Sequence, residues 1–306
     1  MSVYGGPEIS NDGLVLSLDA ANLKSYDPRE NILPYSEADV TNWTELTSST
    51  SKTNLNLNAL GLFKGVLVTS NVAASWRRVG TGNVFTLTSG NVYTLTYFYR
   101  AGNTGAARLQ VRINGVESLV QGPVDGSNWT IQNSAGTVSD VTTLLMEDGL
   151  TYKTTYVLTS NQTGTCSLAI GVGVAIAGGT VIALGGQIEN GSNHNGYLET
   201  TGTAIQRSTT TTNLTNNNVT GSFVGGVEFL SDNNGKFVFD GSDDYVTIPF
   251  NASTMDFSSG QTIGIWMKPA TGSNSARRNP YNQAYGGPGT LTYETNRTIN
   301  YYFGTN

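Results

Sequence analysis

The densest group of potential metal ligands is the run Asp240-Gly241-Ser242-Asp243-Asp244, which places three carboxylates within five residues. Ca²⁺ prefers carboxylate and carbonyl oxygens, so Asp243 and Asp244 could bind it together with a carbonyl or an asparagine of another loop. The same residue types also stabilise a tight turn, because Asp and Ser side chains hydrogen-bond to nearby backbone groups. We expect the turn and no cofactor, with calcium as the alternative.

The sequence lacks most of the residues that hydrolases and metalloenzymes need. It contains one histidine, His194, and one cysteine, Cys166, which excludes a multi-histidine zinc site and argues against thiol catalysis. It has no G-x-S-x-G nucleophile elbow and no glycine motif for phosphates. We therefore expect no enzymatic activity, no catalytic residue, and a buried, inert Cys166.

Aromatic side chains are the remaining candidates for ligand contact, since exposed rings stack on the apolar face of a sugar. Trp76 is flanked by small residues and by the pair Arg77-Arg78, so Trp76 and Arg77 are the first candidates for carbohydrate contact. Trp129 is a further candidate. Trp43 is expected in the core, and a single tryptophan in a β-domain is more often buried than exposed.

The composition indicates which elements must position these residues. Of the 306 residues only 12% are charged, 38% are hydrophobic, and the net charge is −6. The usual charged fraction is about 25%, and here Thr, Ser, Asn and Gly replace the missing charge. Thr, Val and Tyr favour strands while Asn and Gly favour turns. The composition therefore predicts an all-β protein, and the length suggests about two domains.

Strand patterns recur along the middle of the chain at the spacing of a sandwich or jelly roll. In residues 91–101, NVYTLTYFYRA, alternation places Tyr93, Leu95, Tyr97 and Tyr99 on one face. The apolar run 168–186 is long enough to span a membrane. Its glycine pairs instead favour two buried strands joined by a Gly-Gly turn. No stretch has helical periodicity, and we expect no membrane insertion.

Several segments resemble two known β-domains. GLVLSLDAANLKSY (13–26), FVFDGSDDYV (237–246) and IGIWMKP (263–269) resemble a concanavalin-like, LamG/pentraxin-like sandwich. NILPYSEADVTNW (31–43) and GGQIENGSNHNGYLETTGTAIQR (185–207) resemble a carbohydrate-binding-module-like jelly roll that recurs in structural proteins of tailed bacteriophages. The chain departs from this second family at residues 193–197, NHNGY, where the family shows a small-residue T-S-Y stretch. Details of this loop are therefore not carried over from the family.

The resemblance implies a domain arrangement, in which a jelly roll over 30–207 is inserted into a concanavalin-like sandwich formed by 1–29 and 208–306. It also implies that Trp266 is a core residue. A concanavalin-like sandwich usually has more strands than these pieces supply. Either the chain is a fragment, which we favour, or a neighbouring chain completes the sheet.

The resemblance implies a virion structural protein of a tailed phage of marine or cyanophage type. Its function would be adhesion, as a fibre, appendage or capsid decoration that presents glycan-binding sandwiches to the host. Expected partners are other virion proteins and host surface glycans, in a homotrimer or another homo-oligomer. The alternatives are a purely architectural decoration without a ligand, and a depolymerase that cuts surface polysaccharide.

Two further observations bear on partners and location. The only basic doublets are Arg77-Arg78 and Arg277-Arg278, too little clustered charge for nucleic acid, and such doublets are usually exposed loop features. The start MSVYGGPEIS lacks the basic and apolar regions of a signal peptide. The composition, poor in charge and rich in Thr, Ser, Asn and Gly, is typical of extracellular and viral β-proteins. A virion protein that is assembled in the host cytoplasm and exposed outside the cell after lysis fits both this composition and the lack of signal-peptide features.

Overall fold

A computed structural model of the chain confirms the all-β fold class. No helix occurs among the residues that the structure describes, so none of them forms a helix that could cross a membrane. The described residues are 16–18, 20, 24–46, 50–55, 65–73, 77–192, 194, 196–212, 214–215, 219–230, 236–249, 262–269, 276–282 and 290–302.

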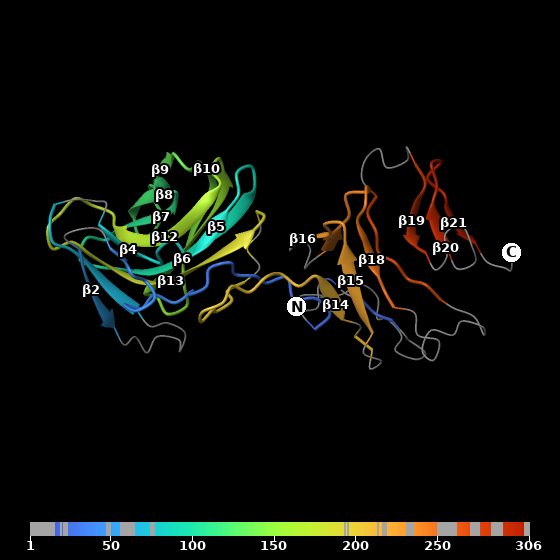
Figure 1. Cartoon of the computed structure of the whole chain (residues 1–306), viewed down its shortest axis with the longest axis horizontal. Helices are drawn as coiled ribbons and strands as arrows, with labels where there is room; N and C mark the ends of the chain where they lie inside the picture. Colours follow the sequence, from blue (N-terminus) through green and yellow to red (C-terminus); the bar gives the residue numbers. More distant parts are fainter. Residues whose placement is uncertain are drawn as a thin grey trace. The chain divides into compact units, whose positions relative to one another are not determined.

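The chain forms two compact units (Figure 1). The larger unit comprises residues 18–212 and 229–237, and the smaller one comprises 1–17, 213–228 and 238–306. The expected domain boundaries, and the insertion of one domain into the other, stay predictions.

The first sheet of the larger unit, the seven-stranded sheet, has the order β1-β4-β12-β7-β8-β9, and β5 also pairs with β12. Its pairings are antiparallel. The strands are β1 (Glu45–Leu46), β4 (Arg78–Gly80), β5 (Phe85–Leu87), β7 (Ala106–Ile113), β8 (Val116–Pro123), β9 (Thr130–Asn133) and β12 (Gly164–Val172).

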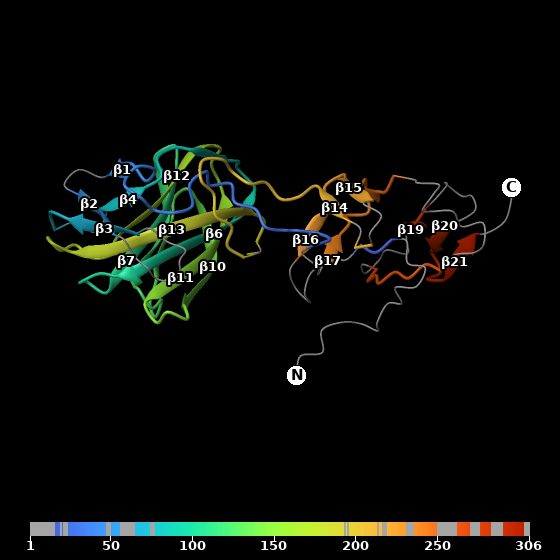
Figure 2. The same ribbon diagram turned by 90° about the horizontal axis from the view of Figure 1, so that it is seen from below.

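The second sheet, the six-stranded sheet, has the order β10-β11-β6-β13-β3-β2 and is also antiparallel. Together the two sheets form a sandwich (Figure 2). The strands are β2 (Thr50–Leu55), β3 (Gly65–Ser70), β6 (Val92–Ala101), β10 (Gly136–Leu145), β11 (Thr151–Ser160) and β13 (Thr180–Asn190).

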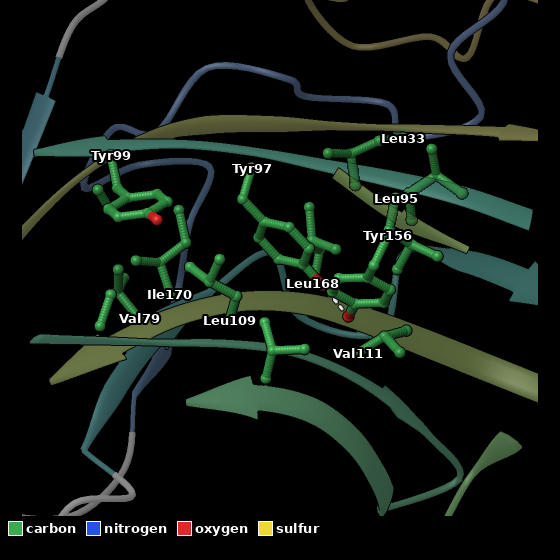
Figure 3. Close-up of a cluster of buried hydrophobic side chains, with 14 of the residues drawn as sticks. Leu33, Val79, Leu95, Tyr97, Tyr99, Leu109, Val111, Tyr156, Leu168 and Ile170 are labelled. Atoms are coloured by element: carbon green, nitrogen blue, oxygen red, sulfur yellow. Dashed lines mark hydrogen bonds between the residues drawn. The ribbon is translucent and has the colours of Figure 1, made fainter. Parts of the chain in front are cut away.

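The core lies between these two sheets, and strand alternation decides which residues enter it. On β6 the predicted face, Tyr93, Leu95, Tyr97 and Tyr99, is buried in the core as expected. Figure 3 shows that side chains from both sheets meet there. Burying such large aromatic and aliphatic side chains stabilises the folded state by about 1.5–3 kcal/mol each.

Two other residues expected in the core are also found there. Trp43 and Cys166 are each 0% exposed, and both belong to the same buried cluster. The indole Nε1 of Trp43 donates a hydrogen bond to the backbone oxygen of Tyr35 at 3.3 Å. This bond satisfies the polar atom of a ring that is otherwise surrounded by apolar groups.

The apolar run 168–186 forms two strands, as predicted, but the strands are not partners in a hairpin. β12 lies in the seven-stranded sheet and β13 in the six-stranded sheet, so the segment between them crosses from one layer of the sandwich to the other. The prediction identified the strands because each is buried, whereas their pairing depends on long-range contacts that a local pattern does not contain.

The connection between β7 and β8 is a tight hairpin turn at Asn114-Gly115. Both residues have positive φ, 50° and 85°, which matches the preference of Asn-Gly for the turn that joins antiparallel strands. Asn-Gly is a local signal for a turn, whereas the strand that follows it carries no comparable signal. On β8 Leu119 and Val120 are adjacent and both buried, which hides the alternation that marks a strand.

The chain segments that flank the sandwich lie beside each other. Antiparallel bridges join Asn31 to Ile205 and Tyr35 to Thr201. The first of these segments also runs along β13, where the Ile32 amide donates to the Ile188 carbonyl at 2.9 Å. β3 pairs with residues 180–183 of β13, and the first flanking segment continues along the same edge of β13 beyond them. The second flanking segment pairs with the first, so both add to the six-stranded sheet.

Elsewhere the described strands form small sheets. β15 pairs with β18, β16 with β17, and β19, β20 and β21 form a three-stranded sheet. A concanavalin-like sandwich is not seen among the described residues. The strands are β14 (Thr210–Thr212), β15 (Thr220–Val224), β16 (Glu228–Leu230), β17 (Lys236–Val238), β18 (Tyr245–Thr247), β19 (Arg278–Tyr281), β20 (Thr290–Tyr293) and β21 (Ile299–Tyr302).

The prediction that Trp266 is a core residue was wrong. Residues 262–269 form no strand, and Trp266 is 81% exposed. Because these residues form no strand, no alternation of side chains turns the indole toward a core. In the resembling segment 13–26, the Ser17 carbonyl accepts a hydrogen bond from the Leu214 amide at 2.9 Å, and residues 16–18 form no strand, whereas residues 13–15 lie outside the described residues.

Candidate functional site

The outer face of the six-stranded sheet carries a cluster of hydrogen-bonding side chains on its central strands, β11, β6 and β13. Because alternate residues of a strand point to opposite faces, the residues of β6 that do not enter the core point outward. The outward positions of β6 are Thr94, Thr96 and Phe98, and the neighbouring strands align further polar residues with them.

The strand register sets which outward side chains are neighbours. Lys153 of β11 is opposite Phe98, and Thr155 is opposite Thr96. On the other side of β6, Thr96 is opposite Gln187 of β13. The hydroxyl oxygens of Thr96 and Thr155 lie 3.2 Å apart, so three central strands contribute side chains to one row.

A histidine–carboxylate pair borders this row. His194 Nδ1 lies 2.7 Å from Glu189 Oε2 and 3.3 Å from the Thr96 hydroxyl. The Glu189 side chain is fully buried, whereas that of His194 is 17% exposed. An ionised carboxylate only accepts hydrogen bonds, so His194 Nδ1 is the donor in this pair, and in the neutral tautomer with its proton on Nδ1 the Nε2 atom is an acceptor.

The loop that contains His194 is anchored to the same face. Gln187 Nε2 donates to the Gly196 carbonyl at 2.8 Å, and Gln187 Oε1 accepts from the Leu198 amide at 2.7 Å. The next aromatic residue, Tyr197, places its ring edge-on to Phe98 with 5.1 Å between centroids. The cluster therefore has a half-buried aromatic wall next to its polar groups.

Lys153 adds a cation to the cluster. Partial burial lowers the pKa of its ammonium, and the charge of Glu189 opposes this effect. The cluster thus combines an ammonium donor, the half-buried Thr155 hydroxyl and an imidazole held by a buried carboxylate. Thr96 is itself 0% exposed, so its hydroxyl fixes its neighbours and does not reach a ligand. Such an arrangement can bind a ligand with several hydroxyl groups. With one carboxylate and one histidine it lacks the ligand set of a structural metal site.

The structure places the arginines of the predicted sugar platform in the interior. Trp76 lies outside the described residues. Arg77 is 6% exposed and Arg78 is 4% exposed, so the expectation that this doublet is an exposed loop feature was wrong. Arg78 belongs to β4, and its guanidinium lies 3.6 Å from the Glu117 carboxylate. Arg78 is buried because β4 lies between β1 and β12 in the seven-stranded sheet.

Trp129 is half-buried at the edge of the sandwich. Its Nε1 donates to the Thr143 hydroxyl at 3.1 Å, and the ring packs against the main core. Its indole N–H is therefore already engaged within the protein. The structure does not bring Trp129 together with Arg77 in any contact among the described residues.

The acidic run forms the expected turn. The Asp240 amide donates to Asp244 Oδ2 at 2.7 Å, and the Ser242 amide donates to Asp240 Oδ1 at 2.7 Å. Asp240, Asp243 and Asp244 place carboxylate oxygens within 4.8 Å of one another, the one such group of three among the described residues. A β-carbon on Gly241 would lie 3.6 Å from the Arg278 guanidinium, so a cation of the protein already neighbours the turn.

Neither Lys153 nor Glu189 is marked by a sequence pattern, and the single His194 was expected to have no role as a metal ligand and was given no other. One signal was available, since His194 is the only histidine and lies where the chain departs from the resembled family. The remaining residues come from three strands, so only the register of the folded sheet brings them together.

The chain shows no match to a protein-family model, nor to a curated protein. Several solved structures resemble it weakly, among them these two. One is the CBM22-1 and GH10 modules of Clostridium thermocellum endo-1,4-β-D-xylanase 10B complexed with xylohexaose, with 14% identity and a TM-score of 0.34, covering 55% of this chain and 29% of that one. The other is the CBM22-1 xylan-binding domain of Paenibacillus barcinonensis Xyn10C, with 13% identity and a TM-score of 0.33, covering 56% and 99%. Similarities this weak establish neither a shared family nor a shared ligand.

Proposed function

We propose that the chain is a glycan-binding adhesion protein and that the outer face of the six-stranded sheet binds the sugar. The observation that carries the proposal is the cluster around His194 and Glu189. Sugar hydroxyls both donate and accept hydrogen bonds, so a site for them needs a few fixed groups of both kinds beside an apolar wall.

Each group of the cluster has a part in this model. Glu189 orients the imidazole of His194, whose Nε2 accepts from a ligand hydroxyl. The ammonium of Lys153 donates to ligand oxygens, and a charged donor gives a stronger hydrogen bond than a neutral one. The half-buried ring of Tyr197 offers an apolar surface to the C–H face of the sugar.

We further propose that the protein is part of a tailed-phage virion, as a fibre, an appendage or a capsid decoration. Its partners would be other virion proteins and host surface glycans, and it would assemble as a homotrimer or another homo-oligomer. The support is a composition poor in charge and rich in Thr, Ser, Asn and Gly, as in many extracellular and viral β-proteins, together with the resemblance of residues 31–43 and 185–207 to the jelly roll of phage structural proteins. Many copies on one particle would multiply a weak single-site affinity, so binding suffices without catalysis or a cofactor.

The test is a glycan array of bacterial surface polysaccharides probed with the full chain, biotinylated and multimerised on streptavidin. We expect binding, and we expect His194→Ala and Lys153→Ala each to weaken it about tenfold or more. Gln132→Ala is the matched control because Gln132 is an exposed polar residue on β9 of the other sheet. Circular dichroism verifies that every variant is folded.

Two outcomes contradict the site. A folded multimer that binds no glycan would favour the architectural function, and unchanged binding by both variants would place the sugar elsewhere. The virion assignment has its own test, since antibodies against the chain should decorate phage particles in immunoelectron microscopy. Particles without label would refute it.

A further inference from the structure

The three-stranded sheet β19-β20-β21 gathers polar and aromatic side chains on one of its faces. The register places Thr290 opposite Tyr302 and Thr292 opposite Asn300. Because side chains alternate along a strand, Thr290, Thr292, Asn300 and Tyr302 point to the same side of the sheet. Leu291 and Tyr301 are opposite each other on the other side.

A single carboxylate organises this face. Glu294 Oε1 accepts from the Thr292 hydroxyl at 2.8 Å and from Asn300 Nδ2 at 3.4 Å, and Arg277 Nε donates to Glu294 Oε2 at 3.1 Å. The Tyr302 hydroxyl is 3.5 Å from Oε1. Hydrogen bonding by Thr292 lowers the pKa of Glu294, with Arg277 adding to the effect and burial opposing it, so the group is charged at neutral pH.

The aromatic ring and the guanidinium next to this carboxylate remain accessible. Tyr302 is 36% exposed, and the Arg277 side chain is 53% exposed while that of Glu294 is 14% exposed. The Arg277 guanidinium carbon lies 5.8 Å from the centre of the Tyr302 ring, a cation–π distance that restrains both side chains. The face thus offers an acceptor, planar donors and a ring edge in restrained positions.

We propose that this face is a second saccharide-binding site, which takes the ring of a pyranose with a vicinal diol. The Glu294 carboxylate accepts from one hydroxyl, the Arg277 guanidinium and the Asn300 amide donate to neighbouring oxygens, and the Tyr302 ring contacts the sugar C–H groups. Charge-assisted bonds provide affinity, and the fixed pairing of acceptor and donors selects the diol geometry. The site goes beyond the function proposed for the sandwich and uses none of its residues.

The test is saturation-transfer-difference NMR with the full chain and four methyl pyranosides, those of glucose, galactose, mannose and N-acetylglucosamine. We expect transfer to at least one sugar, and we expect Tyr302→Ala to weaken its binding about tenfold. Tyr301→Ala is the matched control, because Tyr301 is adjacent and equally exposed at 36% but lies on the opposite face. Asn300→Ala, which keeps both rings, should also weaken binding if Tyr302→Ala disturbs the local fold.

The outcomes separate this site from the sandwich site. Transfer that persists in His194→Ala and falls in Tyr302→Ala and Asn300→Ala supports the second site. Equal losses in Tyr301→Ala and Tyr302→Ala would refute it, as would no transfer to any of the four sugars. Transfer lost in His194→Ala alone would refute it too, while leaving the sandwich proposal in place.

Discussion

The hydroxyl groups of Tyr97 and Tyr156 lie 2.7 Å apart in the centre of the sandwich core. Their rings stack with centroids 5.5 Å apart and planes inclined by 24°, and both side chains are 0% exposed (Figure 3). Burial raises the pKa of both phenols, so the bond joins two neutral hydroxyls at any ordinary pH. Adjacent strands β6 and β11 are therefore joined by a side-chain bond as well as by their backbones.

Removing either hydroxyl leaves the other buried without its partner. We expect Tyr97→Phe or Tyr156→Phe to lower the free energy of unfolding by about 1–3 kcal/mol. The double variant should lose less than the sum of the two, because it leaves no unpaired hydroxyl. Urea unfolding followed by circular dichroism measures this, and additive losses would show that the bond does not couple the two residues.

Asp148 makes the sandwich sensitive to acid. Burial acts to raise its pKa, but hydrogen bonds from Thr151, Leu150 and Arg100 outweigh it and lower the pKa from 3.8 to about 2. A folded-state pKa below the unfolded value contributes stability that is present above the unfolded pKa and lost as the pH falls through the folded pKa.

We expect the stability difference between the wild type and Asp148→Asn to shrink as the pH falls from about 4 to about 2. Thermal unfolding at a series of pH values measures this difference. Glu147→Gln, at the exposed neighbouring carboxyl, is the control. A difference that stays constant over this range would contradict the role assigned to Asp148.

Cys166 should be unreactive in the folded protein. Its side chain is 0% exposed, and burial raises the pKa of its thiol to about 11, against a smaller opposing effect of a backbone hydrogen bond from Leu87. The thiolate is the reactive form. We expect Ellman's reagent at pH 8 to label the native protein roughly a hundredfold or more slower than the protein unfolded in urea. Equal rates would mean that the sheet around Cys166 opens readily.

Trp266 should be the most accessible of the described tryptophans. It is 81% exposed, whereas Trp43 is 0% exposed. We expect iodide to quench part of the tryptophan fluorescence, and Trp266→Phe to reduce that quenchable part with little change in unfolding free energy, because an exposed side chain away from the core contributes little. A large loss of stability in this variant would show that the indole is covered in solution.

The strand pattern could be predicted from the sequence for particular physical reasons. Alternation in residues 91–101 identified β6 and its core face, because one buried face imposes a period of two. Asn114-Gly115 is likewise a local signal, for a turn, because few other residue pairs adopt positive φ at both positions. The failures have equally specific reasons, since Trp266 was assigned by resemblance and the buried Arg78 by the general preference of charged pairs for the surface.

By itself, the sequence determined the all-β fold class, the inward face of β6, and the absence of a multi-histidine site, all of which depend on local pattern or composition. Only the tertiary structure decided that β12 and β13 lie in opposite sheets and that His194 meets Glu189. Which strands become neighbours depends on contacts between residues far apart in the chain. A shift of one residue in register would turn Lys153 and Thr155 from the outer face into the core.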